Sequence, residues 1–205
     1  MIIVGILGII IIGAVLLGPV MSNVENPSYE VIQSDKKIEI RKYQPMIVAQ
    51  VELEGNRKEA IQLGFRVLAD YIFGSNTTEK DIAMTAPVEQ ESSQKIPMTA
   101  PVEQELSGNS WKIRFVMPKK YTLETLPKPK NPQIRILEIP EQTYVVIRFS
   151  GTASDRNIKV HETELMDYVK RENIPTVGST KYAFYNPPWT LPFLKRNEVM
   201  IQEKT

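Results

Sequence analysis

The stretch IAMTAPVEQESSQKIPMTAPVEQE, residues 82–105, contains the octapeptide MTAPVEQE twice, at Met84–Glu91 and at Met98–Glu105. Around the start of each copy, apolar residues alternate with other residues, which is the period of a β-strand with one apolar face. Each copy carries a proline at the same place, and proline cannot donate a hydrogen bond to a neighbouring strand. The repeat therefore predicts two neighbouring strands joined by a turn near Ser92 and Ser93, each with its proline at an edge or a bulge.

The methionines of the repeat allow two interpretations. Met84 and Met98 either fill the core, or line an apolar pocket, because methionine adapts its shape to irregular cavities. The hydroxyls of Thr85 and Thr99 are the only nucleophiles of MTAPV, and no neighbouring residue would activate them. We therefore expect a structural or binding role for the repeat, not a catalytic one.

The segments on both sides of the repeat predict an α+β domain. Strands are expected at residues 29–33, 37–43, 46–53, 111–118, 134–140, 143–151, 180–185 and 197–202. A first amphipathic helix is expected between Asn56, a candidate N-cap, and Gly74, and a second helix from Ser154. The order of strands, helix and strands thus occurs twice, as in two related half-domains. We expect a strongly curved antiparallel sheet or distorted barrel, with both helices on one side.

Composition excludes several classes of protein. The chain has 205 residues, no cysteine, one histidine and a formal net charge of +1. Without cysteine there is no disulfide, zinc–thiolate site, iron–sulfur cluster or cysteine nucleophile. No dense basic run is present, so the attraction that dominates nucleic-acid binding is missing. The sequence also lacks the short motifs of P-loop, Rossmann, serine-hydrolase and zincin sites.

The N-terminal segment differs in kind from the rest of the chain. Residues 1–21 carry no charged or polar side chain, and about 20 apolar residues are enough for a helix to cross a bilayer. They indicate either an uncleaved transmembrane anchor or a secretion signal, and the lack of a preceding basic residue favours the anchor. Residues 22–28 follow as a polar linker, and the folded domain is expected at 29–205. We expect this domain outside the cytoplasm, held at the membrane or exported after cleavage.

In combination, these segments resemble the SOUL haem-binding protein family. The resemblance covers about residues 28–203, and it is carried by YEVIQSDKKIEIRKY, GFRVLADYIFGSN, the two MTAPV segments, WKIRFVMPKKYTLETLPKP, VVIRFSG and YNPPWTLPFLKRNEVMI. It implies a distorted antiparallel barrel with two helices and two pseudo-repeated halves. It also implies that haem or another tetrapyrrole binds in an apolar groove without enzymatic turnover.

The resemblance implies a groove along the first helix, beside a loop near the end of the chain. The helix positions carried over are Ile61, Phe65, Leu68, Ala69 and Ile72, the loop positions are Tyr185, Trp189 and Phe193, and Met84 and Met98 are added for their apolar character. Family members that bind haem well tend to place basic residues on this helix, whereas this chain has Gln62 and Asp70 at the positions we align. Its nearest basic residues are Arg57, Lys58 and Arg66.

The lone histidine and two acids mark the remaining alternatives. His161 is expected on the surface of the second helix, and as a single histidine it could at most be one axial ligand to haem iron. No other metal ligand and no catalytic residue is expected. Glu198 is expected as a surface acid paired with Arg196, but Glu198 or Glu52 would be the buried acid if the domain were hydrolytic.

Three functions follow as hypotheses. The first is tetrapyrrole binding for transport or buffering at the cell envelope, with a small-molecule tetrapyrrole and the membrane as partners. The second is a small-molecule-binding or hydrolytic domain of the related two-repeat regulator fold. The third is an envelope scaffold with no small ligand, which would have a filled groove.

Overall fold

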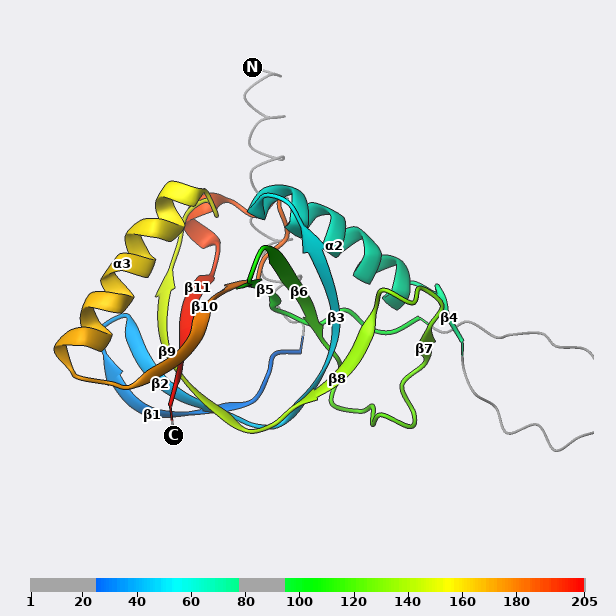
Figure 1. The fold of residues 1–205 in the computed structure, drawn as a ribbon, viewed down its shortest axis with the longest axis horizontal. Helices are drawn as coiled ribbons and strands as arrows, with labels where there is room; N and C mark the ends of the chain where they lie inside the picture. Colours follow the sequence, from blue (N-terminus) through cyan, green and yellow to red (C-terminus); the bar gives the residue numbers. More distant parts are fainter. Residues whose placement is uncertain (1–24, 78–94, 205) are drawn as a thin grey trace, which may run out of the picture.

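A computed structural model describes residues 25–77 and 95–204 of the chain. Nine antiparallel strands form one curled sheet in the order β1-β2-β9-β11-β10-β5-β6-β3-β8, and a further short pair, β4-β7, lies apart from it. Figure 1 shows the two helices, α2 and α3, on the same side of this sheet, with their N-terminal ends close together. This arrangement confirms the predicted α+β fold with a strongly curved antiparallel sheet and two helices.

The elements follow the expected order along the chain. They are β1 (Tyr29–Asp35), β2 (Ile38–Tyr43), β3 (Met46–Glu54), α2 (Arg57–Ile72), β4 (Asn76–Thr77), β5 (Val102–Ser107), β6 (Ser110–Val116), β7 (Lys128–Pro129), β8 (Arg135–Ile139), β9 (Gln142–Phe149), α3 (Asp155–Arg171), β10 (Thr176–Phe184), the 3-10 helix η1 (Pro192–Leu194) and β11 (Asn197–Glu203). None of the described helices is long and apolar enough to cross a bilayer, and the predicted anchor, residues 1–21, lies outside the described residues.

Each helix has its own hydrophobic core. Helix α2 packs on β3 and β6, and helix α3 packs on β9 and β11. Leu68 and Ile72 of α2 contact a core that includes Ile113 of β6, whereas Leu165 of α3 belongs to a separate core on β9 and β11. Two cores on one sheet are what the repeated order of strands, helix and strands predicts.

Both helices begin at the predicted caps. The Asn56 side chain accepts a hydrogen bond from the Glu59 N–H at 3.0 Å, and the Ser154 hydroxyl accepts one from the Asn157 N–H at 3.3 Å. Each cap satisfies one of the backbone donors that a helix leaves free at its start. At the other end of α2, Gly74 has a φ of +130°, a conformation that glycine adopts without strain.

Gly64 brings α2 into direct contact with the sheet. A Cβ atom at this position would lie 2.5 Å from Cγ1 of Ile113, which belongs to the core below. We expect Gly64→Ala to lower the free energy of unfolding by about 1–3 kcal/mol, because overpacking forces the helix away from β6. Leu63→Ala is the matched control, since Leu63 is exposed and its loss should change stability by roughly 0.5 kcal/mol or less. Equal urea midpoints for the two variants would contradict this account of the contact.

The second copy of the repeat is not the strand that its alternation predicts. Strand β5 begins only at Val102, and the preceding residues, 96–101, have no regular structure. Two prolines in this short run remove backbone donors, and two of the remaining N–H groups bond to separate elements: Ile96 to the Ile72 carbonyl and Ala100 to the Glu25 carbonyl. Met98 is consequently exposed, not part of an apolar strand face. The first copy lies outside the described residues.

Candidate ligand-binding groove

An open groove of about 650 Å³ runs along α2. Its other wall is formed by the start of β5, the residue before α3's cap, the end of β10 and the loop that follows β10. The residues that line it are Arg57, Lys58, Ile61, Gln62, Phe65, Arg66, Ala69, Asp70, Val102, Ala153, Phe184, Asn186 and Pro188. The groove therefore lies where the two half-domains meet, beside the N-terminal ends of both helices.

The walls of the groove are apolar on both sides. Ile61, Phe65 and Ala69 are four residues apart, so they form one row on the surface of α2. The Phe65 ring packs edge-on against Phe115, with the ring centroids 5.4 Å apart, and this contact holds its exposed side toward the groove. Phe184 is among the apolar residues of the facing wall. Such a slot suits a flat apolar ligand.

The rim of the groove is charged and mainly basic. Arg57, Lys58 and Arg66 line it together with a single acid, Asp70. Lys58 and Arg66 are exposed, and Arg66 makes no ion pair with any residue in the ranges 25–77 and 95–204. These three basic residues therefore lie on the face of α2 that borders the groove.

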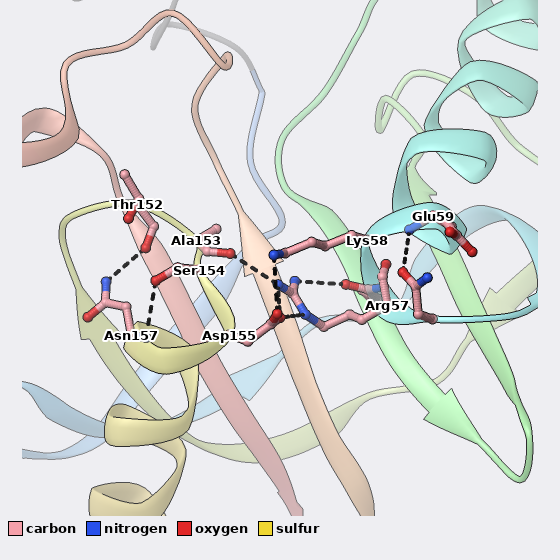
Figure 2. Close-up of polar contacts among 10 residues, drawn as sticks. Arg57, Lys58, Glu59, Thr152, Ala153, Ser154, Asp155 and Asn157 are labelled. Carbon is pink, nitrogen blue, oxygen red and sulfur yellow. Dashed lines mark hydrogen bonds and ion pairs between the residues drawn. The ribbon is translucent and has the colours of Figure 1, made fainter.

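Arg57 joins the N-terminal ends of the two helices (Figure 2). Its guanidinium donates two hydrogen bonds to Oδ1 of Asp155, at 2.8 and 2.5 Å, and one to the Ala153 carbonyl at 3.1 Å. Lys58 adds a weaker contact with Asp155 at 3.4 Å. The Gln104 side chain donates to the Arg57 carbonyl at 2.8 Å. Arg57 thus fixes this end of the groove, whereas Lys58 and Arg66 are exposed residues of its lining.

The Arg57–Asp155 pair gives a pH-dependent prediction. Hydrogen bonding to Arg57, with the help of Lys58, lowers the pKa of Asp155 from its ordinary value. An acid with a lowered folded-state pKa stabilises the fold above its unfolded pKa of about 3.9, and this stabilisation is lost as the pH falls through the folded pKa. Asp155 is 63% exposed, so we expect Asp155→Asn to lower the free energy of unfolding by less than about 1 kcal/mol at pH 7. Below the folded-state pKa of Asp155 the substitution should have no effect on stability. Urea unfolding across this range tests the prediction, and a difference that does not vary with pH would contradict it.

A buried ionic cluster holds the loop between β10 and β11, which contributes Asn186 and Pro188 to the facing wall of the groove. Glu198 is fully buried; its Oε1 lies 3.0 Å from Arg41 Nη1 and 2.9 Å from Arg196 Nε, and its Oε2 accepts a hydrogen bond from the Tyr185 hydroxyl at 2.7 Å. Arg196 also stacks on the Tyr185 ring at 3.8 Å. Because Tyr185 and Arg196 are the two ends of the loop, the cluster closes its base.

The prediction for Glu198 needs correction. Its pairing with Arg196 is confirmed, but its expected place at the surface is wrong, because the carboxylate lies on the side of the sheet opposite the helices and is enclosed there. Burial, and then the nearby Glu198 charge, raise the pKa of Tyr185 well above its ordinary value. Although burial alone would lower it, the charge of Glu198 raises the pKa of Arg41. Tyr185 and Arg41 therefore keep their protons at neutral pH.

Comparison with known proteins identifies the family of this chain and agrees with its fold. The family model described as "SOUL heme-binding protein" matches residues 24–202, nearly all of the chain. The chain belongs to the SOUL heme-binding protein family. Comparison with curated proteins gave no match.

Solved structures share the fold of this SOUL domain. The EcmrR C-terminal domain is 10% identical, with a TM-score of 0.60, and the match covers 86% of this chain and 98% of that one. A hydrolase from Listeria innocua is 15% identical, with a TM-score of 0.53 over 84% and 94% of the two chains. At such low identities the likeness shows the fold alone.

The SOUL domain brings together part of the predicted site on α2. Ile61, Phe65 and Ala69 line the groove, whereas Leu68 and Ile72 point into the core between α2 and the sheet. Sequence reasoning missed the facing wall, whose residues are Val102, Ala153, Phe184, Asn186 and Pro188. The signal for Phe184 was present, because strand alternation places it on the face opposite to Tyr185.

The other predicted residues lie away from the groove lining. Tyr185 is buried in the Glu198 cluster, and Trp189 and Phe193 are 69% and 71% exposed. Met98 is exposed outside the groove, and Met84 lies outside the described residues. His161, on α3, stacks on Phe149 of β9, and its Nδ1 lies 2.8 Å from the Asn157 carbonyl oxygen.

The acids named for a hydrolytic site do not line the groove of the SOUL domain. Both carboxylate oxygens of Glu198 are bound by buried donors, and Glu52 is exposed and accepts a hydrogen bond from Ser110. Within residues 25–77 and 95–204, no three acidic or histidine side chains come close enough to hold a metal ion. The described lining of the groove is mainly apolar, with Arg57, Lys58 and Arg66 as its basic residues.

Proposed function

We propose that this SOUL-family domain binds haem or another tetrapyrrole in the groove along α2, without turnover. The observation that carries the proposal is the combination of two facing apolar walls with a basic rim in a groove of about 650 Å³. This volume lies in the usual range of ligand pockets, about 300–1,000 Å³. An open slot of this kind also disfavours the third hypothesis, a scaffold with a filled groove.

The groove suggests how the ligand lies. The flat ring would pack between Phe65 on α2 and Phe184 on the facing wall, and would cover apolar surface on both of its faces. The ring's carboxylates would turn outward to Lys58 and Arg66 at the open edge, where exposed cations attract anions without losing their water. Arg57 would contribute less, because Asp155 already neutralises it.

The groove lining offers iron no strong ligand. Its described residues include no histidine, cysteine, methionine or tyrosine, the side chains that commonly ligate haem iron. Affinity would therefore come from ring burial and the carboxylates alone. We expect binding in the micromolar range, and we expect iron to add little to it.

Titration with haem and with metal-free protoporphyrin tests this proposal. We expect both to bind one site with dissociation constants within about threefold of each other, followed by the Soret band for haem and by fluorescence for the free porphyrin. The absence of saturable binding by either compound would refute tetrapyrrole binding. Binding of haem at least tenfold tighter than free porphyrin would show that the protein ligates the iron, contrary to the proposal.

The cellular role is the finer part of the proposal and rests on the sequence. Residues 1–21 would anchor the domain at a membrane, outside the cytoplasm, where reversible binding serves transport or buffering of a tetrapyrrole. Fractionation of cells that express the full chain tests this role. Recovery of the chain from the membrane fraction after alkaline extraction would support anchoring, and its release would contradict it.

A further inference from the structure

We propose that the loop between β10 and β11 docks on the surface of a phospholipid bilayer through its apolar tip, which we define as Trp189, Phe193 and Leu194. These side chains are 69%, 71% and 47% exposed. Exposed large apolar residues that cluster on one loop mark a surface for a partner or a membrane. The inference rests on the proposed anchoring of residues 1–21 and is independent of tetrapyrrole binding.

The tip is exposed because the loop is held in shape. The Lys195 ammonium donates to the Pro188 carbonyl at 3.0 Å, and the Gly151 N–H donates to the Pro192 carbonyl at 2.8 Å, which ties the loop to the connection between β9 and α3. A turn of 3-10 helix, η1, carries two of the three tip residues. The apolar side chains are thus presented outward by a preformed scaffold, with little conformational entropy left to lose on docking.

The tip is separate from the ligand groove. The loop contributes Asn186 and Pro188 to the groove lining, and the tip residues are not part of that lining. The base of the loop is fixed by Tyr185 and Arg196 in the buried Glu198 cluster. The groove and the tip are therefore two surfaces of the same loop, available for different partners.

The path of the chain indicates which partner the tip meets. The Glu25 carbonyl accepts a hydrogen bond from Ala100 at 3.0 Å, and Ala100 packs against Tyr185 at the base of the loop. Only residues 22–24 separate Glu25 from the apolar segment 1–21. Four extended residue steps reach about 14 Å at most, so a bilayer that holds this segment would lie close to the base of the loop.

The composition of the tip fits the bilayer interface. Tryptophan is enriched at the level of lipid headgroups, where its ring is half apolar and its N–H finds a polar partner. Phenylalanine and leucine beside it add area for insertion into the acyl boundary. The chemistry and the distance both favour a lipid surface over a protein partner.

Single-tryptophan variants of the full chain in proteoliposomes test the inference. Trp111→Phe leaves Trp189 as the only tryptophan, and we expect lipids brominated on their acyl chains to reduce its fluorescence at least twofold relative to unbrominated phosphatidylcholine, without haem present. The matched control carries Trp111→Phe, Trp189→Phe and Phe73→Trp. Phe73 is also exposed but follows the far end of α2, about 24 Å along the helix from Arg57, and its emission should not change.

Three results would overturn the inference. One is a Trp189 emission that brominated lipids do not affect and that aqueous iodide quenches as strongly with vesicles as in detergent. Another is a full chain that does not float with the vesicles. The last is quenching of Trp189 that occurs only when haem is added, which would make the tip a cover for the ligand. Soret titration of the same variants reports tetrapyrrole binding separately, so each proposal can fail without the other.

Discussion

Glu198→Gln is expected to lower the free energy of unfolding by about 3–5 kcal/mol, because it removes the fully buried partner of Arg41 and leaves that charge with only the part-exposed Glu39. Arg41 is only 2% exposed and depends on Glu198 at 3.0 Å. Arg196 and Tyr185 would face a neutral amide at the same time. Urea unfolding of the variant at neutral pH, followed by circular dichroism, measures the loss.

Glu39→Gln is the matched control for this prediction. Glu39 contacts the same guanidinium, at 2.6 Å from Arg41 Nε. It is 30% exposed, so water already screens part of this interaction. We expect its replacement to cost about 1 kcal/mol or less. A Glu198→Gln variant no less stable than the Glu39→Gln variant would show that the cluster is not what closes the base of the loop.

Phe65→Glu is expected to weaken haem binding by about 10- to 100-fold. The ring forms the middle of the α2 wall, and a carboxylate there would be covered by the ligand and lose its water, or would have to take up a proton. It would also repel the ligand's own carboxylates. Because Phe65 is 38% exposed in the free domain, the fold itself should tolerate the change.

Phe73→Glu places the same charge on an exposed phenylalanine just after the end of α2, outside the groove lining. We expect its haem affinity to stay within about twofold of the wild type, which corresponds to roughly 0.4 kcal/mol. Equal losses in the two variants would point to a general effect of charge. No loss for Phe65→Glu would place the ligand elsewhere.

Local patterns were enough to predict the helices and most strands. Asn56 and Ser154 cap the helices as their side chains suggest, and the apolar periods match β2, β3 and β9. The second MTAPV copy is the exception, because its prolines remove the donors that a strand would need. The short pair β4-β7 carries no apolar period and has only two residues in each strand.

The burial of Glu198 could not be predicted from its own strand. Its partner Arg41 lies 157 residues away in the sequence, and the two meet because their strands, β2 and β11, lie on either side of β9 in the sheet. Alternation tells which face a residue takes, but it does not tell whether the face opposite the helices is open or closed.

The site was predicted in part for a similar reason. The apolar stripe of α2 combines two rows: Ile61, Phe65 and Ala69 face the groove, whereas Leu68 and Ile72 face the sheet. A wide apolar stripe in the sequence does not separate these rows, because both lie within the arc that an amphipathic helix buries. Only the position of the facing wall does so.

The position of the bound ring tests the central claim most directly. With zinc protoporphyrin as the probe, methyl NMR of the domain should show the largest ring-current shifts at Ile61, Ala69 and Val102, the methyl-bearing residues on both walls of the groove. Small shifts there, with the largest at Leu123 and Met46 in the separate cavity of about 530 Å³ or beside His161 on α3, would contradict the assignment of the groove as the tetrapyrrole site.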